Sequence, residues 1–283
     1  MRRAARWALI LAIPALLAAT VARGMIEARS DPIQRVAAIE LPDWPAGARP
    51  IKVALISDIH IGNLGMDAAR LRRIVGQVDA AKPDLILLAG DFVVGHTPSG
   101  IEARAAQLTA PLSGLKAPLG TLAVLGNHDY WTGEASVRAA LEAAGVTVLD
   151  NRTVRRGPVR VAGLSDFVTG HDDIAAALAS GQAEGGAIVA LDHAPDLAPL
   201  LPPAVHLLLA GHTHCGQVVL PLIGAAPNWS PHQHGRRLYN PRYLCGIVQD
   251  PGRTVIVTAG VGSGTVPARL GAPPDYWLIT LGP

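Results

Sequence analysis

The sequence predicts a layered α/β fold in which two β-sheets stack on each other. From residue 51 onward, short apolar runs typical of strands alternate with segments of helical periodicity. Strand-like runs become dense late in the chain, which favours two sheets over one. Hydrophobic residues form 49% of the 283 residues and aromatic residues only 4%. The chain can therefore build one large core, mainly from Ala, Val, Leu and Ile.

The helices are predicted from apolar spacing and from the residues that end them. The 67–81 segment places its apolar residues on one face and ends before Pro83. The 134–144 segment is followed by Gly145, which suits a helix C-terminus. The other predicted helices are 101–115 and 173–179.

The strands are predicted from apolar runs that turn or polar residues terminate. The first such runs are KVALIS from residue 52, DLILLA from residue 84 and TLAVL from residue 121. The later predicted strands are 146–149, 159–164, 187–191, 205–210, 218–220, 254–258 and 276–281. Residues 221–243 interrupt this rhythm with several prolines and are predicted to form a long surface loop, a kind of segment that is often functional.

Residues 1–30 form a separate N-terminal segment. Three arginines within Met1–Arg6 precede an uncharged stretch at 7–22, which is typical of a signal peptide or a membrane anchor. We expect an uncleaved anchor in the inner, cytoplasmic membrane that leaves the catalytic body facing outward, and a secreted protein if the segment is cleaved. Residues 31–50, rich in proline, are predicted to be an irregular linker, and 51–283 one domain.

Polar side chains cluster in a fixed order along the chain, and each cluster directly follows a strand-like run. Because strand ends can meet at one edge of a sheet, these side chains are expected to gather at one site. Aspartate, histidine and asparagine there are suitable ligands for hard-to-borderline metal ions. The predicted ligands are Asp58, His60, Asp91, Asn127, His193, His212 and His214.

Seven ligands are enough for two metal ions that share one carboxylate. His212 and His214 alternate along the chain and can serve adjacent ions, and the two oxygens of Asp91 allow it to bridge. Two divalent ions contribute about +4, two carboxylates about −2 and a bridging hydroxide about −1, which leaves roughly +1. Such a site favours an anionic substrate, and a phosphate ester fits it well.

His128 lies within the same motif as Asn127 but is not one of the seven predicted ligands. A histidine beside a metal pair can protonate a leaving oxygen, and Asp129 is predicted to accept its other N–H and fix its orientation. His96 and His171 do not follow a predicted strand and are assigned to the surface. His206 lies within a predicted strand and is assigned a structural role. For His232, His234, Arg236 and Arg237, a solvated loop and substrate contact are equally open.

These motifs, in this order, resemble the calcineurin-like metallophosphoesterases over about residues 51–281. The resemblance implies an α/β/β/α sandwich with a dinuclear centre. It assigns Asp58, His60, Asp91 and His214 to the first ion, and Asp91, Asn127, His193 and His212 to the second. His128 becomes the catalytic histidine.

The sequence after the last motif resembles a membrane-associated bacterial branch that includes YkuE-like and YaeI-like phosphodiesterases. The shared features are Gly216-Gln217, Arg269 and Pro273-Pro274. Some relatives cleave the pyrophosphate of UDP-2,3-diacylglucosamine. Cys215 stands where that branch has glycine, which could place a thiol near the metals. Because the chain has only two cysteines, Cys215 and Cys245, a single bridge between them is the alternative. Arg269 is predicted to be either a phosphate clamp or half of a structural ion pair.

The predicted function is metal-dependent hydrolysis of a phosphodiester or pyrophosphate bond by a metal-bridging hydroxide. The substrate is a phosphorylated small molecule or a lipid-linked one, and Mn, Fe and Zn all suit the ligand set. A rival from another class is a membrane-tethered metal-binding protein without catalysis. Net charge is only +2 and the body has no basic block, so a nucleic-acid partner is not expected.

Overall fold

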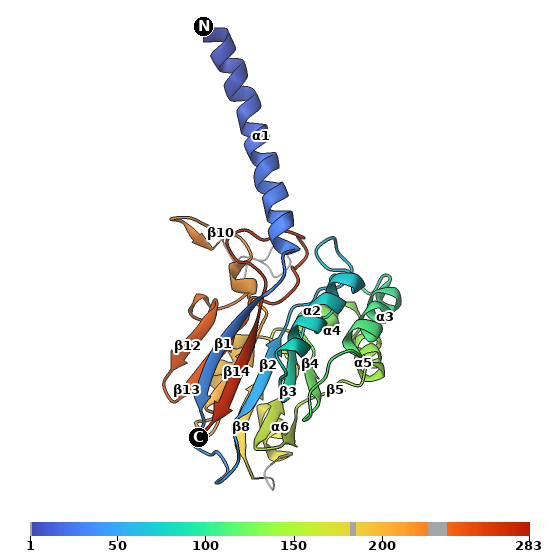
Figure 1. Ribbon diagram of the computed structural model, residues 1–283, viewed down its shortest axis with the longest axis vertical. Coiled ribbons are helices and arrows are strands. Elements are labelled where there is room, and N and C mark those ends of the chain that lie inside the picture. Colours follow the sequence, from blue (N-terminus) through green and yellow to red (C-terminus); the bar gives the residue numbers. More distant parts are fainter. Residues whose placement is uncertain (1, 182–184, 226–236) are drawn as a thin grey trace.

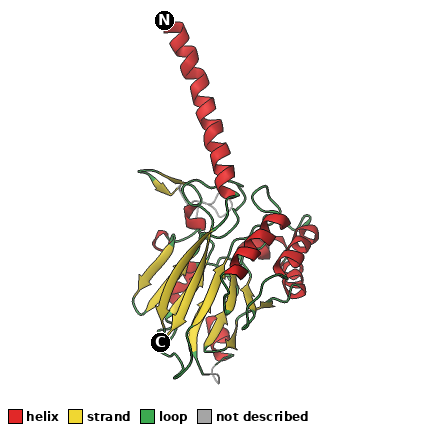
Figure 2. Ribbon diagram, viewed as in Figure 1, coloured by secondary structure: helices red, strands yellow, loops and turns green. Residues whose placement is uncertain are grey.

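The computed structural model describes residues 2–181, 185–225 and 237–283, and these build two stacked six-stranded sheets (Figures 1 and 2). In the first sheet β2 to β5 are parallel, β14 runs antiparallel to β2, and β1 runs parallel to β14. Its strand order is β1 (Ile33–Glu40), β14 (Asp275–Gly282), β2 (Ile51–Ile56), β3 (Leu85–Ala89), β4 (Thr121–Val124) and β5 (Thr147–Val148).

The second sheet has a parallel centre and an antiparallel strand at each edge. Its strand order is β12 (Gly246–Asp250), β13 (Arg253–Val257), β9 (Leu207–Ala210), β8 (Ala187–Leu191), β7 (Val159–Gly163) and β6 (Arg152–Arg156). A separate antiparallel hairpin joins β10 (Val219–Leu220) to β11 (Gly224–Ala225).

Helices cover the outer face of each sheet. They are α2 (Ala68–Ala80), α3 (Ile101–Leu112), α4 (Asn127–Thr132), α5 (Glu134–Ala143) and α6 (Ile174–Ala179), with short 3-10 turns η1 (Pro195–Leu200), η2 (His214–Gly216) and η4 (Pro241–Tyr243). Alternate residues of β3 serve different layers: Ile86 packs in the core with α2, α3 and α5, whereas Leu87 packs between the sheets. Ala177 of α6 covers the outer face of the second sheet. The α/β/β/α arrangement confirms the predicted fold class.

Helix α1 (Arg2–Ala28) projects from one end of this body (Figure 1). Within the described part of the chain, no helix has both the length and the apolar character needed to cross a membrane. Two buried arginines hold the base of α1. Arg70 donates to Arg29 O and Ser30 O, and the backbone N–H of Arg269 donates to Gly24 O.

The observed elements differ from the expected ones mainly at the sheet edges. Residues 31–50 are not an irregular linker throughout, because β1 lies within them and pairs with β14 over eight residues. Strands β6 and β12 and helix α4 were not expected either. The expected surface loop at 221–243 contains part of the β10–β11 hairpin and η4, and His232, His234 and Arg236 lie outside the described residues.

Candidate metal centre

The predicted ligands meet where five parallel strands end. β2, β3 and β4 of the first sheet lead to Asp58, Asp91 and Asn127, and β8 and β9 of the second sheet lead to His193 and His212. All five side chains are buried or nearly so. The site therefore lies between the two sheets at one end of the sandwich, the end from which α1 projects (Figure 1).

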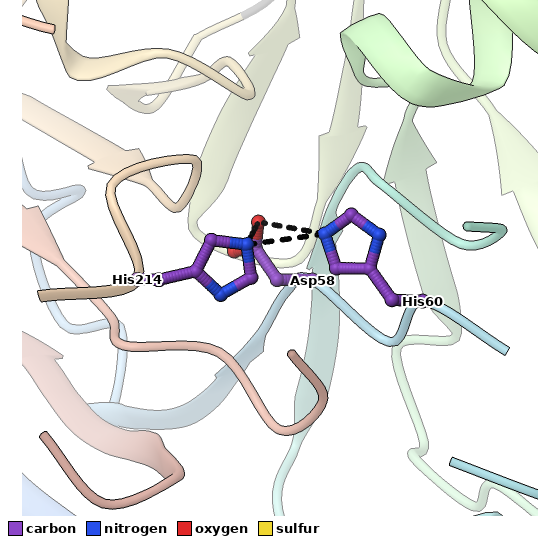
Figure 3. Close-up of side chains that lie close together, drawn as sticks. All are labelled: Asp58, His60 and His214. Carbon is purple, nitrogen blue, oxygen red and sulfur yellow. Dashed lines mark hydrogen bonds and ion pairs between the residues drawn. The ribbon is translucent and has the colours of Figure 1, made fainter. Parts of the chain in front are cut away.

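One group of ligands consists of Asp58, His60 and His214, whose side chains converge (Figure 3). His60 Nε2 lies 3.1 Å from His214 Nε2, and Asp58 Oδ1 lies 3.4 Å from His214 Nε2. The other oxygen of Asp58 accepts hydrogen bonds from Ser57 Oγ and the backbone N–H of His212. Oδ1 alone is therefore left to face the two imidazoles.

Asp91 connects this group to a second one. Its Oδ1 accepts from the backbone N–H of His128 at 2.9 Å. Its Oδ2 lies 3.4 Å from His60 Nε2 and 3.3 Å from His193 Nε2. Because this oxygen lies between ligands of both groups, Asp91 has the position required of a shared carboxylate.

The second group consists of His193, His212 and Asn127. His193 Nε2 lies 3.2 Å from His212 Nδ1. The opposite ring nitrogens donate to carbonyl oxygens, His193 Nδ1 to Ala89 O at 2.7 Å and His212 Nε2 to Leu238 O at 2.9 Å. Each ring is thus held in the tautomer whose remaining nitrogen has a lone pair for a metal.

The chemistry of this donor set fits metal ions. Asp58 Oδ1 and Asn127 Oδ1 are buried acceptors without a hydrogen-bond partner, a costly arrangement that a cation would resolve. Burial lowers the pKa of His60 to about 3 and also lowers the pKa of His212 and His214, which keeps these imidazoles neutral and able to bind metal.

The two carboxylates respond differently to the same burial. Burial raises the pKa of Asp58 to about 7, and the nearby Asp91 carboxylate adds to the rise. Burial would also raise the pKa of Asp91, but His193 and His128 hold it well below its usual range. Conversely, burial would lower the pKa of His193, but Asp91 raises it well above its usual range. Each of these two groups therefore favours the charged form of the other, and metal binding at His193 Nε2 would displace the proton there.

Strained backbone conformations are concentrated at the ligands. Left-handed φ angles between 48° and 68° occur at Asp58, His60, Asp91, His212 and His214. Such conformations cost energy for residues other than glycine and are often found at functional sites. Gly90 has φ 82°, and a Cβ there would lie 2.7 Å from Gly126 N and 2.8 Å from His193 Nδ1. Only glycine allows this close approach.

His128 lies beside the metal ligands, but its partner differs from the prediction. His128 Nδ1 donates to Gly95 O at 2.6 Å, not to Asp129. Its ring lies edge-on to His60 with centroids 4.9 Å apart, and His60, Asp91 and His128 form a group close enough to hold an ion. Its remaining nitrogen, Nε2, is therefore available for chemistry at the site.

The predicted role of Asp129 is wrong. Its carboxylate accepts four backbone N–H groups, from Gly126, Asp91, Phe92 and Val93. The bond from Gly126 is the return half of a capping box at the start of α4, in which the third helical residue reaches back to the cap. Asp129 thus fixes the loop of Asp91 against the loop of Asn127 and acts on the site through them.

Sequence reasoning missed a pair of aromatic side chains beside His128. His96, assigned to the surface, is exposed, but its ring centroid lies 4.8 Å from that of His128 and 5.3 Å from that of Trp131. His96 Nε2 also lies 2.9 Å from Thr265 Oγ1. His171 stacks on Tyr130, and His206 Nδ1 donates to Gly252 O. Neither His96 nor Trp131 belongs to a motif, so no sequence pattern pointed to them.

Arg269 is neither a phosphate clamp nor an ion-pair partner. Its guanidinium is completely buried and donates to five backbone carbonyls, those of His214, Ala259, Gly260, Gly262 and Ala272. Its Nη2 also lies 3.1 Å from His214 Nδ1. Arg269 therefore supports the loop behind His214, on the side away from the other ligands.

Cys215 and Cys245 form a disulfide, so there is no free thiol near the metal ligands. The bridge joins η2, which begins at His214, to the segment that follows η4. Beside it, Thr213 Oγ1 donates to Leu244 O at 2.7 Å.

Comparisons with known proteins agree with this site. Residues 51–216, more than half of the chain, match the family model described as calcineurin-like phosphoesterase. The chain is 33% identical to metallophosphoesterase F40B5.2 of Caenorhabditis elegans, over 69% of this chain and 43% of that protein. It is 30% identical to a transmembrane protein with a metallophosphoesterase domain from Danio rerio, over 96% of this chain and 62% of that protein. The metallophosphoesterase YkuE of Bacillus subtilis is 30% identical, over 84% of this chain and 81% of its own length. The chain thus spans only about half of the first two relatives.

Proposed function

Because the chain belongs to the calcineurin-like phosphoesterase family, we propose that it hydrolyses a phosphodiester or pyrophosphate bond with two divalent metal ions. The observation that carries this proposal is the position of Asp91 Oδ2, within 3.4 Å of an imidazole nitrogen from each ligand group. A single-ion site would not need ligands on both sides of one carboxylate oxygen.

The residues on each side of Asp91 would hold one ion each. Asp58, His60 and His214 would hold the first, and Asn127, His193 and His212 the second. When bound, the ions supply Lewis acidity toward phosphoryl oxygens and lower the pKa of water. The neutral imidazoles leave the loaded site with a small positive charge, which attracts an anionic phosphate ester. Mn, Fe and Zn all suit these nitrogen and oxygen donors.

His128 would donate the proton that the leaving oxygen requires. Its Nδ1–H is committed to Gly95 O, so Nε2 is the nitrogen that can carry and release a proton toward the site. The backbone N–H of the same residue is bonded to Asp91 Oδ1, which fixes the ring relative to the shared carboxylate.

Hydrolysis of an aryl phosphodiester in the presence of Mn²⁺ tests the proposal. We expect turnover that a chelator abolishes and that Mn²⁺ restores. His128→Ala should lower turnover by about 10²–10⁴-fold with the metal content unchanged, whereas His171→Ala, on an exposed histidine, should leave turnover unchanged. Metal binding without turnover would favour the rival, a metal-binding protein without catalysis. A nucleotide pyrophosphate in the same assay separates the two bond types.

We further propose that residues 1–30 attach the protein to the cytoplasmic membrane with the body outside. The Cys215–Cys245 disulfide supports this placement, because such bridges persist in oxidising compartments. Proteolysis of intact cells tests it: the body should be digested from outside, and its protection would place it in the cytoplasm.

A further inference from the structure

Exposed apolar side chains gather on loops at the end of the body that carries the metal centre. Leu222 and Ile223 occupy the tip of the β10–β11 hairpin, and Ile223 is 77% exposed. Val266, 60% exposed, lies on the 263–270 segment, and Leu64 lies on the 61–66 loop. Large apolar side chains exposed together from separate loops usually mark an interaction surface. We call these four residues the apolar rim.

The apolar rim is continuous with the metal centre because its loops are bonded to one another. Asn63 Nδ2 donates to Ser263 O and Gly264 O, which joins the first loop to the second. The backbone N–H of Val219 donates to Leu270 O, which joins the hairpin to the second loop. Thr265, next to Val266, contacts His96 beside the proposed proton donor. The rim thus borders the exposed side of the site.

Helix α1 begins its projection from the same loops and indicates what covers the rim. The 263–270 segment bonds to α1 through Arg269 N and Gly24 O, and Arg29 bonds to Leu64 O. The large exposed side chains of Ile13, Leu16, Leu17 and Val21 lie along one side of α1, and Ile26 lies on the opposite side. Residues 12–22 are all exposed and none is charged, so α1 presents an uncharged surface on every side over three turns. A protein partner would cover one face of such a helix, whereas lipid surrounds it.

We propose that the apolar rim docks onto a lipid bilayer, so that the metal centre faces the lipid headgroups. Leu222 and Ile223 would enter the interfacial layer beside α1, and Val266 and Leu64 would rest on it. This docking needs no helix that crosses the membrane, because the contact is made by the loops and by the sides of α1. The docking rests on the proposed membrane attachment through residues 1–30, but it stands apart from the hydrolytic function.

A thiol-attached fluorophore in the full-length protein tests the docking. Both native cysteines are in the disulfide, so Ile223→Cys and Val266→Cys each provide the only free thiol. The matched control is Leu200→Cys, 57% exposed, at the opposite end of the sandwich beside the β12–β13 turn, where Arg253 bonds to Leu201 O. Each variant is labelled with nitrobenzoxadiazole and mixed with phosphatidylcholine–phosphatidylglycerol vesicles.

We expect a severalfold rise in emission at positions 223 and 266, quenched by headgroup nitroxide lipids, and no change at position 200. Adding Leu222→Asp to the Val266→Cys protein should abolish its response while α1 remains. Equal responses at all three positions, no response at 223 and 266, or a response without vesicles would each overturn the proposal. Turnover of the soluble aryl diester by the same proteins reports the hydrolytic function separately, because a loss of docking leaves that reaction intact.

Discussion

Removal of the Cys215–Cys245 disulfide should weaken both the fold and one half of the metal centre. We consider the double variant Cys215→Ala/Cys245→Ala. The bridge spans a sequence separation of 30 residues. The loop-closure relation for such a length gives about 3.6 kcal/mol of stability, which comes from restricting the unfolded chain.

The effect on the site follows from the segment that the bridge holds. That segment is residues 238–245, which include η4 and end at Cys245. Leu238 O, before η4, accepts from His212 Nε2, and Leu244 O, after η4, accepts from Thr213 Oγ1. Without the bridge, the contact between the His212 side chain and this segment depends on these two hydrogen bonds, while the backbone N–H of His212 stays bonded to Asp58 Oδ2. We therefore expect the second ion to be bound more weakly than the first, so that a chelator removes it at a lower concentration.

Denaturant unfolding measures the first effect, and elemental analysis after graded chelation measures the second. Reductant should lower the unfolding midpoint of the wild-type protein to that of the double variant and should not change the variant itself. Equal free energies of unfolding for the two proteins under oxidising conditions would refute the reasoning. Equal retention of both ions would refute the link from the bridge to His212.

Three further substitutions test the support of the site. Asp129→Asn replaces an acceptor of four N–H groups with an amide side chain that cannot accept them all, so it should cost about 2–4 kcal/mol in denaturant unfolding. Unchanged stability with an altered pH profile of turnover would instead favour the rejected role, in which Asp129 orients His128. Gly90→Ala should displace His193 and leave about one ion per chain by elemental analysis, and two tightly held ions would contradict the steric argument. Arg269→Lys replaces a guanidinium that bonds several carbonyls behind His214 with a single ammonium group, and it should lower the free energy of unfolding by about 3 kcal/mol. An unfolding midpoint equal to that of the wild type would show that those carbonyls need no such donor.

The layers and the ligands could be predicted because both depend on local patterns. A buried parallel strand is a short apolar run, and a polar residue directly after it must lie at the strand end, as Asp58 and Asp91 do. Strand β1 was missed because it lies on the edge of the first sheet and is largely exposed, so the sequence IQRVAAIE lacks a buried strand's composition. Strand β6, with the sequence RTVRR, was missed for the same reason.

Side-chain partners could not be predicted because they depend on how separate loops meet. Asp129 follows His128 in sequence, yet a helix begins at Asn127 and turns the carboxylate back toward the N–H groups of its first turn. Gly95 O reaches His128 from the loop after β3, a placement that only the packed structure determines. The capping pattern was nevertheless visible, since an acidic residue three positions after Gly126 is typical of a helix start.

The short connection between α1 and the first sheet limits how the body can move on its helix. Only residues 29–32 separate the end of α1 from β1. Strand β1 pairs with β14 over eight residues. A force along α1 would therefore pull β1 lengthwise against β14. It would act on many of the hydrogen bonds between these two strands at once and not on one bond at a time. The orientation of the body is therefore coupled to the orientation of α1. A contact that fixes the angle of α1 also fixes the direction in which the metal centre faces.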